Sequence, residues 1–143
     1  YPAGYYDLVV SNLALHYLAD LDDIYRKAFS TLRPGGVFLF NIEHPVFTAG
    51  VREDWVRDTE GRPVCWPVDN YYYPGERTTL FLGQEVKKQH HTLTQILMGL
   101  IRCGFVLEAV EEAMPDPSML DLPGMADEMR RPMMLLVKAR KPV

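Results

Sequence analysis

This sequence has few cysteines, no long apolar run and no excess of positive charge. Apolar runs such as Ile96 to Ile101 fall far short of the ~20 residues that a membrane-spanning helix needs. The two cysteines, Cys65 and Cys103, lie far apart in no metal-like spacing, which favours free thiols in a reducing compartment. A net charge of −4 supplies no broad basic field for nucleic acid. We therefore expect a cytoplasmic protein with neither a membrane nor a nucleic-acid partner.

What remains is the composition of a soluble globular protein. The 143 residues are 48% hydrophobic and 24% charged, without a signal-peptide pattern, repeat or low-complexity tract. This length and balance predict one domain over residues 1–143.

The first 42 residues have the pattern of a strand, a helix and a second strand. Tyr5 to Val10 is nearly continuous in apolar character, which predicts a central parallel strand covered on both faces. Asp20 is a candidate cap for a helix with a single apolar stripe. The helix stops at Arg33-Pro34-Gly35-Gly36, where Pro then Gly fits a type II turn, and Val37 to Ile42 reads as a second buried strand. The alternation predicts an α/β fold.

Both predicted strands end in polar residues. Ser11-Asn12 follows the first strand, and Glu43-His44-Pro45 follows the second. Because open α/β sheets bind ligands beyond the carboxyl ends of parallel strands, these two tips are expected to form one crevice.

The apolar pattern weakens after the second strand. Residues 46–74 carry two Trp and a Tyr triplet among Pro, Gly and charged residues, which is typical of a lid or binding loop. Residues 78–81 and 85–89 predict a hairpin, so 46–91 is expected to be a lid and hairpin insertion within the domain. Thr92 and Gln95 then fit a capping box for a helix that Gly104 ends, before strands over 105–111 and 133–139.

Several of these segments resemble class I S-adenosylmethionine-dependent methyltransferases, most closely the small-molecule group called type 11. The resemblance covers the whole chain and is carried by Asp7 to Asn12, the following Leu-His segment, Leu32-Arg33-Pro34-Gly35-Gly36 and Val37 to Phe40. It implies a Rossmann-like methyltransferase fold with S-adenosyl-L-methionine as cofactor. In the family strand order 3-2-1-4-5-7-6, the strands seen here would be the fourth to seventh.

The family's Gly-rich cofactor turn and acidic second-strand residue are absent from the sequence given. The chain therefore resembles the carboxyl-terminal half of such an enzyme, expected to be inactive alone. Without its neighbour, the strand at Tyr5 to Asn12 would become an unpaired edge. We expect it to pair with a second copy in a homo-oligomer, or with the missing N-terminal half of the same protein.

The resemblance points to the first strand end for the cofactor. Ser11, Asn12, Leu13 and His16 are the candidate cofactor-binding residues; a capped strand end for Ser11 and Asn12, and simple core packing for Leu13, are the alternatives. His16 and His44 are candidate catalytic bases, because histidine titrates near neutral pH. Each has a structural alternative, a packed side chain for His16 and a fixed His-Pro turn for His44.

The substrate site is expected beneath the lid. His44, Tyr71, Tyr72 and His91 are the candidate substrate-binding residues, with Tyr71 to Tyr73, Trp55 and Trp66 forming either an aromatic wall or ordinary packing under the loop. His90 and His91 point to opposite faces of an extended segment, so only one can enter a given pocket. No helix-spaced histidine pair exists, and no metal site is expected.

Two functions remain open from the sequence. The first is a methyltransferase acting on a small molecule, with this chain supplying the substrate-side half. The second is a non-catalytic α/β interaction module or remnant, stabilised by self-association through the exposed edge.

Overall fold

A computed structural model describes residues 1–50 and 52–143. It contains a four-stranded sheet in the order β1-β2-β8-β7, formed by β1 (Tyr6–Asn12), β2 (Leu32–Glu43), β7 (Val106–Ala113) and β8 (Met134–Arg140). β1 and β2 are parallel, whereas β8 is antiparallel to both of its neighbours. This is the order implied above for the fourth, fifth, seventh and sixth strands.

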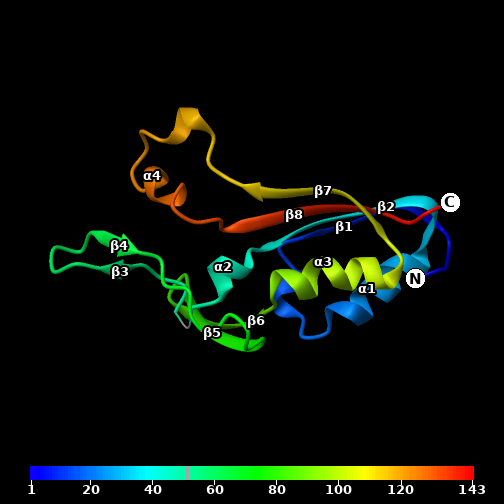
Figure 1. The fold of residues 1–143 in the computed structure, drawn as a ribbon, viewed down its shortest axis with the longest axis horizontal. Coiled ribbons are helices and arrows are strands. Elements are labelled where there is room, and N and C mark those ends of the chain that lie inside the picture. The colour runs from blue at the N-terminus through cyan, green and yellow to red at the C-terminus, as the bar shows by residue number, and fades with distance from the viewer. Residues whose placement is uncertain (51) are drawn as a thin grey trace.

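Two helices cover one face of the sheet (Figure 1). α1 (Leu21–Thr31) begins at Asp20, whose side chain accepts a hydrogen bond from the Asp23 N–H as expected for a cap. α3 (Leu93–Cys103) begins at the predicted capping box of Thr92 and Gln95, and Gly104 ends it at φ +104°. The helices and the sheet together contribute the largest buried core side chains, among them Tyr25, Phe38, Phe40, Leu32, Ile42, Ile96, Leu100, Leu135 and Val137.

The connection into β2 takes the turn that the sequence predicts. Gly35 has φ +79°, which a proline-glycine type II turn requires, and no Cβ fits at Gly36, where it would lie 2.9 Å from the Arg33 carbonyl oxygen. The assigned strand starts earlier than predicted, at Leu32, because Leu32 already pairs with Tyr6 before a bulge.

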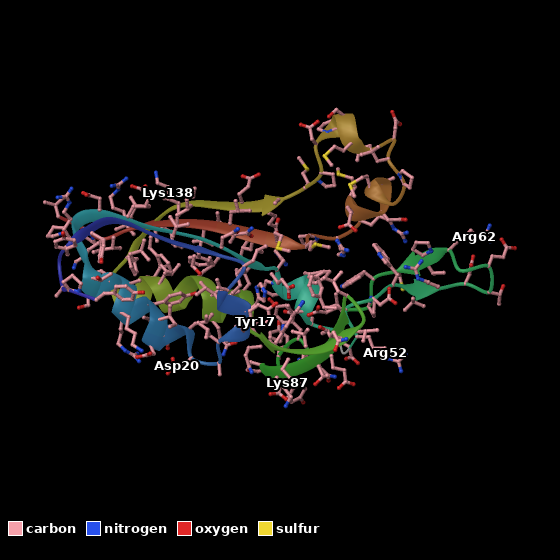
Figure 2. All side chains as sticks on the ribbon, turned by 180° about the vertical axis from the view of Figure 1, so that it is seen from behind. Tyr17, Asp20, Arg52, Arg62, Lys87 and Lys138 are labelled. Carbon is pink, nitrogen blue, oxygen red and sulfur yellow. The ribbon has the colours of Figure 1, made fainter. Side chains whose placement is uncertain are left out.

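The opposite face of the sheet carries no packed layer among the described residues. Leu8 and Val10 of β1 are 52% and 58% exposed, and Leu39 of β2 lies on the same face. Lys138 of β8 also stands on this side, away from the helices (Figure 2). The prediction that the first strand is covered on both faces is therefore wrong for this chain, because β1 is an edge strand packed on one side only.

Residues 45–91 extend beyond the carboxyl ends of β1 and β2, the side of the sheet that is called the ligand edge below (Figure 1). They contain α2 (Pro45–Thr48), the short pair β3 (Val56–Arg57) and β4 (Pro63–Cys65), and the predicted hairpin, β5 (Gly75–Phe81) with β6 (Gln84–His90). Leu82 and Gly83 form its two-residue turn, both at positive φ, which matches the twist of the paired strands.

Three short helices complete the described part of the chain. η1 (Leu15–Tyr17) follows β1, and η2 (Pro117–Met119) and α4 (Met125–Glu128) lie between β7 and β8. No helix among the described residues is long and apolar enough to cross a membrane.

Candidate ligand site at the strand ends

The carboxyl ends of β1 and β2 lie side by side. Ser11 pairs with Phe40 and Asn12 with Asn41, so the two strands end at the same side of the sheet as predicted, but β2 continues to Glu43, beyond the last residue of β1. The Asn41 Nδ2 donates to Asn12 Oδ1 at 3.2 Å, and the Leu13 N–H donates to the Asn41 carbonyl at 2.9 Å. Ser11, Asn12 and Leu13 therefore occupy the edge of the sheet where parallel α/β folds bind ligands.

Two features at this edge are unusual for a plain strand terminus. Leu13 has φ +54°, a left-handed conformation that residues with a side chain disfavour and that occurs preferentially at binding sites. The Asn41 Oδ1 is buried without a hydrogen-bond partner. A buried acceptor left in this state costs free energy, so the strand tip has the capacity to receive a donor from a ligand.

An open cavity of about 820 Å³ lies between β1 and α1, next to this tip. Its lining is mainly apolar and includes Tyr6, Val9, Ser11, Leu15, Ile24 and Phe38. The cavity borders the unpaired edge of β1. A further helix or strand of the protein could therefore fill it, as could a small molecule.

His16 lies in η1 and is held against the end of β2. Its Nδ1 accepts the Glu43 N–H at 3.3 Å, which places the proton of the neutral ring on Nε2. Burial lowers the pKa of His16, although the nearby Glu43 carboxylate opposes this. His16 is thus neutral near pH 7, and only its Nε2, 4.0 Å from Glu43 Oε1, is available for proton transfer.

His44 has both ring nitrogens engaged. Its Nδ1 accepts the Val46 N–H at 3.0 Å and so caps α2, while Nε2 donates to Glu112 Oε1 of β7 at 2.7 Å. Burial lowers the pKa of His44, and the hydrogen bond to Glu112 opposes the shift. These contacts match the fixed turn that the sequence left open as the alternative to a basic role.

The remaining predicted residues divide between buried and exposed positions. His91 Nε2 donates to the Leu18 carbonyl at 2.8 Å, and the Tyr71 hydroxyl accepts the Leu93 N–H at 3.0 Å at the start of α3. Tyr72 is 84% exposed. His91 is therefore bonded to the residue that follows η1 and Tyr71 to the first residue of α3, whereas Tyr72 is exposed to solvent.

The two tryptophans surround an arginine of the chain itself. Phe47 and Trp66 stack at 5.0 Å, and the Arg131 guanidinium lies 4.4 Å from the Trp66 ring centroid and 5.4 Å from that of Trp55. Glu128 holds the same guanidinium through two hydrogen bonds. The tryptophans thus attach the segment before β8 to residues 47–66.

A buried ionic cluster under the hairpin was missed by the sequence reasoning. Lys88 Nζ donates to Glu43 Oε1 at 2.6 Å and to Glu53 Oε2 at 3.0 Å, and the three side chains are 4%, 8% and 5% exposed. Strand alternation was the available signal, because Lys87 and Lys88 must face opposite sides of β6. Lys87 indeed points away from the sheet (Figure 2), whereas Lys88 is buried.

Comparisons with known proteins agree with this architecture. A family model described as a methyltransferase domain matches residues 1–40. The crystal structure of an S-adenosylmethionine-dependent methyltransferase from Mesorhizobium loti is 43% identical with a TM-score of 0.87, and the alignment covers 98% of this chain and 64% of that one. A Listeria monocytogenes protein assigned to the same enzymes is 47% identical with a TM-score of 0.93, over 99% and 64% of the two chains.

An uncharacterised protein of Haemophilus influenzae is 28% identical over 145 residues, 98% of this chain and 56% of that protein. The chain thus spans between about half and two thirds of the length of these relatives. The fold, the strand order and the matches confirm the resemblance found in the sequence: over nearly its whole length the chain is similar in sequence and structure to S-adenosylmethionine-dependent methyltransferases.

Proposed function

We propose that the protein transfers a methyl group from S-adenosyl-L-methionine to a small molecule in the cytoplasm, and that this chain supplies the substrate-side half. The observation that carries the proposal is the joint tip of β1 and β2, where a strained Leu13 and an unpartnered Asn41 Oδ1 meet. Both features cost stability and are explained by a ligand at this edge.

The residues of the strand tip fit such a cofactor in their chemistry. Ser11, Asn12 and Asn41 offer hydrogen-bonding groups, and Leu13 is 42% exposed beside them as an apolar surface. We assign Ser11, Asn12, Leu13 and His16 to cofactor binding. When bound, the cofactor supplies an electrophilic methyl group, so the protein has mainly to hold the acceptor in line with it.

His16 and His44 have different roles in this proposal. His16 presents an Nε2–H toward Glu43 while its Nδ1 accepts the Glu43 N–H, so the proton released by an acceptor is taken up by the Glu43 carboxylate, with the neutral His16 ring beside it as a positioning group. His44 fixes the turn between β2 and α2 and contacts Glu112, which makes it a positioning residue for the substrate side. Tyr71 and His91 support the hairpin that covers the substrate, and we keep Tyr72, which is exposed in the segment before the hairpin, as a proposed substrate contact.

The free edge of β1 is the proposed attachment site for the rest of the enzyme. Its outer backbone groups are unpaired, Leu8 and Val10 are exposed on the open face, and the large cavity borders it. An apolar edge strand of this kind pairs with another chain unless it is covered. We propose that the additional part of the longer relatives covers it, and that the chain alone forms a homo-oligomer through the same edge.

Isothermal titration with S-adenosyl-L-methionine tests the assignment. We expect micromolar binding by a protein extended to the length of the relatives, and weak or absent binding by residues 1–143 alone. Failure of the extended protein to bind contradicts the methyltransferase proposal. Micromolar binding by residues 1–143 contradicts the division into halves.

Self-association is tested separately by sedimentation. Residues 1–143 are expected to dimerise or form larger species, and a Val10→Lys variant, which places a charge on the open face, is expected to weaken this. A chain that stays folded and monomeric at high concentration contradicts the edge-pairing proposal. Self-association by an extended protein that does not bind the cofactor favours the alternative, a non-catalytic interaction module.

A further inference from the structure

The ionic cluster of Glu43, Glu53 and Lys88 joins three separate segments at the ligand edge of the sheet. Glu43 is the last residue of β2, Glu53 lies between α2 and β3, and Lys88 comes from the inner face of the hairpin. All three side chains are more than nine-tenths buried. The cluster therefore sits where a substrate bound beyond β1 and β2 would be enclosed by the hairpin.

The charges of this cluster do not balance. One ammonium faces two carboxylates, while His16, the other titratable group beside Glu43, is kept neutral by its burial. Two other cations lie nearby. Arg77, the cross-strand partner of Lys88, donates to the Asn70 and Tyr73 carbonyls, and Arg131, which contacts Phe47, is paired with Glu128. An excess negative charge in a buried site is costly, so it calls for a proton or for an additional cation.

Unused hydrogen-bond acceptors accompany this excess charge. Glu43 Oε2 and Glu53 Oε1 are both buried without a partner. Thr79 is 4% exposed, and its Oγ1 also lacks a partner. Because Arg77 pairs with Lys88 in the hairpin, Thr79 lies two residues along on the same inner face as Lys88. Two carboxylate oxygens of the cluster, and one hydroxyl on the same inner face of the hairpin as Lys88, are thus buried without a partner.

A protonated primary amine supplies both the positive charge and the hydrogen-bond donors that this cluster lacks. Its single positive charge neutralises the cluster, and its three N–H donors equal the number of free oxygens. A neutral hydroxyl would supply one donor and no charge, and an anion would add to the excess. The chemistry therefore selects an ammonium group over the other common substituents of small metabolites.

We propose that Glu43 and Glu53, with Lys88 and Thr79, form the recognition site for a primary ammonium group carried by the small molecule that the protein methylates. This inference rests on the proposed function and names the substrate class of that site. The ammonium is the recognised group and not the methylated atom, because a protonated nitrogen has no lone pair for attack. Glu53 has a φ of +47°, a conformation that is unfavourable for a residue with a side chain and that occurs preferentially at binding sites.

Ethanolamine and ethylene glycol provide a matched pair of probes, since they differ mainly in the replacement of an ammonium by a hydroxyl. Titration of the extended protein at pH 7.5 and constant ionic strength is expected to give saturable binding of ethanolamine, with at least about tenfold weaker binding of ethylene glycol. Equal affinity for the two probes, or no binding of either, overturns the inference. A proton then remains as the counter-charge of the cluster.

Glu53→Gln is the decisive variant. It keeps the size of the side chain and an acceptor for Lys88 but removes the excess charge, so it should fold and lose ethanolamine affinity by about tenfold or more. Glu60→Gln is the matched control, because Glu60 is an exposed glutamate of the β3 to β4 connection that pairs with Arg62. Unchanged ethanolamine binding in Glu53→Gln overturns the proposal, as does an equal loss in Glu60→Gln.

Cofactor titration of the same samples separates this inference from the proposed function. Binding of S-adenosyl-L-methionine without binding of ethanolamine overturns the amine site alone. Binding of ethanolamine without the cofactor supports the amine site and contradicts the methyltransferase assignment.

Discussion

Replacing Lys88 by methionine isolates the energetic role of the buried cluster. The substitution removes the two short hydrogen bonds to Glu43 and Glu53 and leaves two carboxylates facing each other in a buried site. Removing one partner of a buried ion pair typically costs about 3–5 kcal/mol, because the remaining charge has lost its counter-ion. We expect a loss of this size in the free energy of unfolding.

Urea unfolding measures this loss directly. With a denaturant dependence of about 2 kcal/mol per molar, typical for a domain of this size, the midpoint of Lys88→Met should fall by about 2 M. Lys87→Met is the matched control: the Lys87 side chain is 70% exposed and pairs with an exposed Glu76, so the urea midpoint of this variant should not change measurably. Addition of Glu43→Gln and Glu53→Gln to Lys88→Met should recover part of the loss.

Equal midpoints for Lys88→Met and Lys87→Met would refute the reasoning. That result would mean that water reaches the cluster and screens its charges. The pKa of Lys88 supplies a second check: burial alone would lower it, but the hydrogen bonds to Glu43 and Glu53 outweigh burial and raise it. The stabilisation should therefore persist at neutral pH and be lost only as the pH rises through this raised value.

Three further perturbations have defined outcomes. Gly99→Ala should destabilise the protein by about 1–3 kcal/mol in thermal unfolding, because the new Cβ would lie 2.8 Å from Asp22 Oδ1 and 2.9 Å from the Tyr25 ring; an unchanged midpoint would show that α1 and α3 separate freely. Thr92→Ala should cost about 1 kcal/mol through loss of the α3 cap, and Thr92→Ser should retain the stability. Burial lowers the pKa of every histidine, so the unfolded chain binds more protons below pH ~6.5, and the urea midpoint should fall as the pH drops from about 7 to 5; a flat profile would contradict the burial of His16, His44, His90 and His91.

Local sequence signals were sufficient to predict the strands of the sheet and the ends of its two helices. The cap at Asp20, the capping box at Thr92 and the left-handed Gly104 are each set by residues within one turn, and all three occur as predicted. The strand order followed from the family resemblance. The expectation for β1 was wrong because burial of its outer face depends on a packing partner, which strand periodicity does not report.

The site was predicted less completely, for a physical reason. The strand tips at Ser11 and Asn12 follow from where two apolar runs end. The pairing of Glu43 with Lys88 spans 45 positions, and the pairing of His44 with Glu112 spans 68. Neither pattern nor propensity carries information on contacts at such separations, so nothing in the sequence marked Lys88 or Glu112 as a partner of these residues.

Polar contacts attach the hairpin and the residue after it to the end of β2 and to the neighbouring segments α2 and η1. Lys88 binds Glu43, His90 lies between Thr48 and the Tyr71 carbonyl, and His91 reaches the Leu18 carbonyl. Apolar contact areas tolerate small displacements, whereas hydrogen bonds of 2.6 to 2.9 Å do not, so this attachment fixes the hairpin in one position over the strand tips. Buried ion pairs add little net stability compared with apolar packing. Their presence at this edge is therefore better explained by the need to place charge precisely where a ligand binds than by a need for stability.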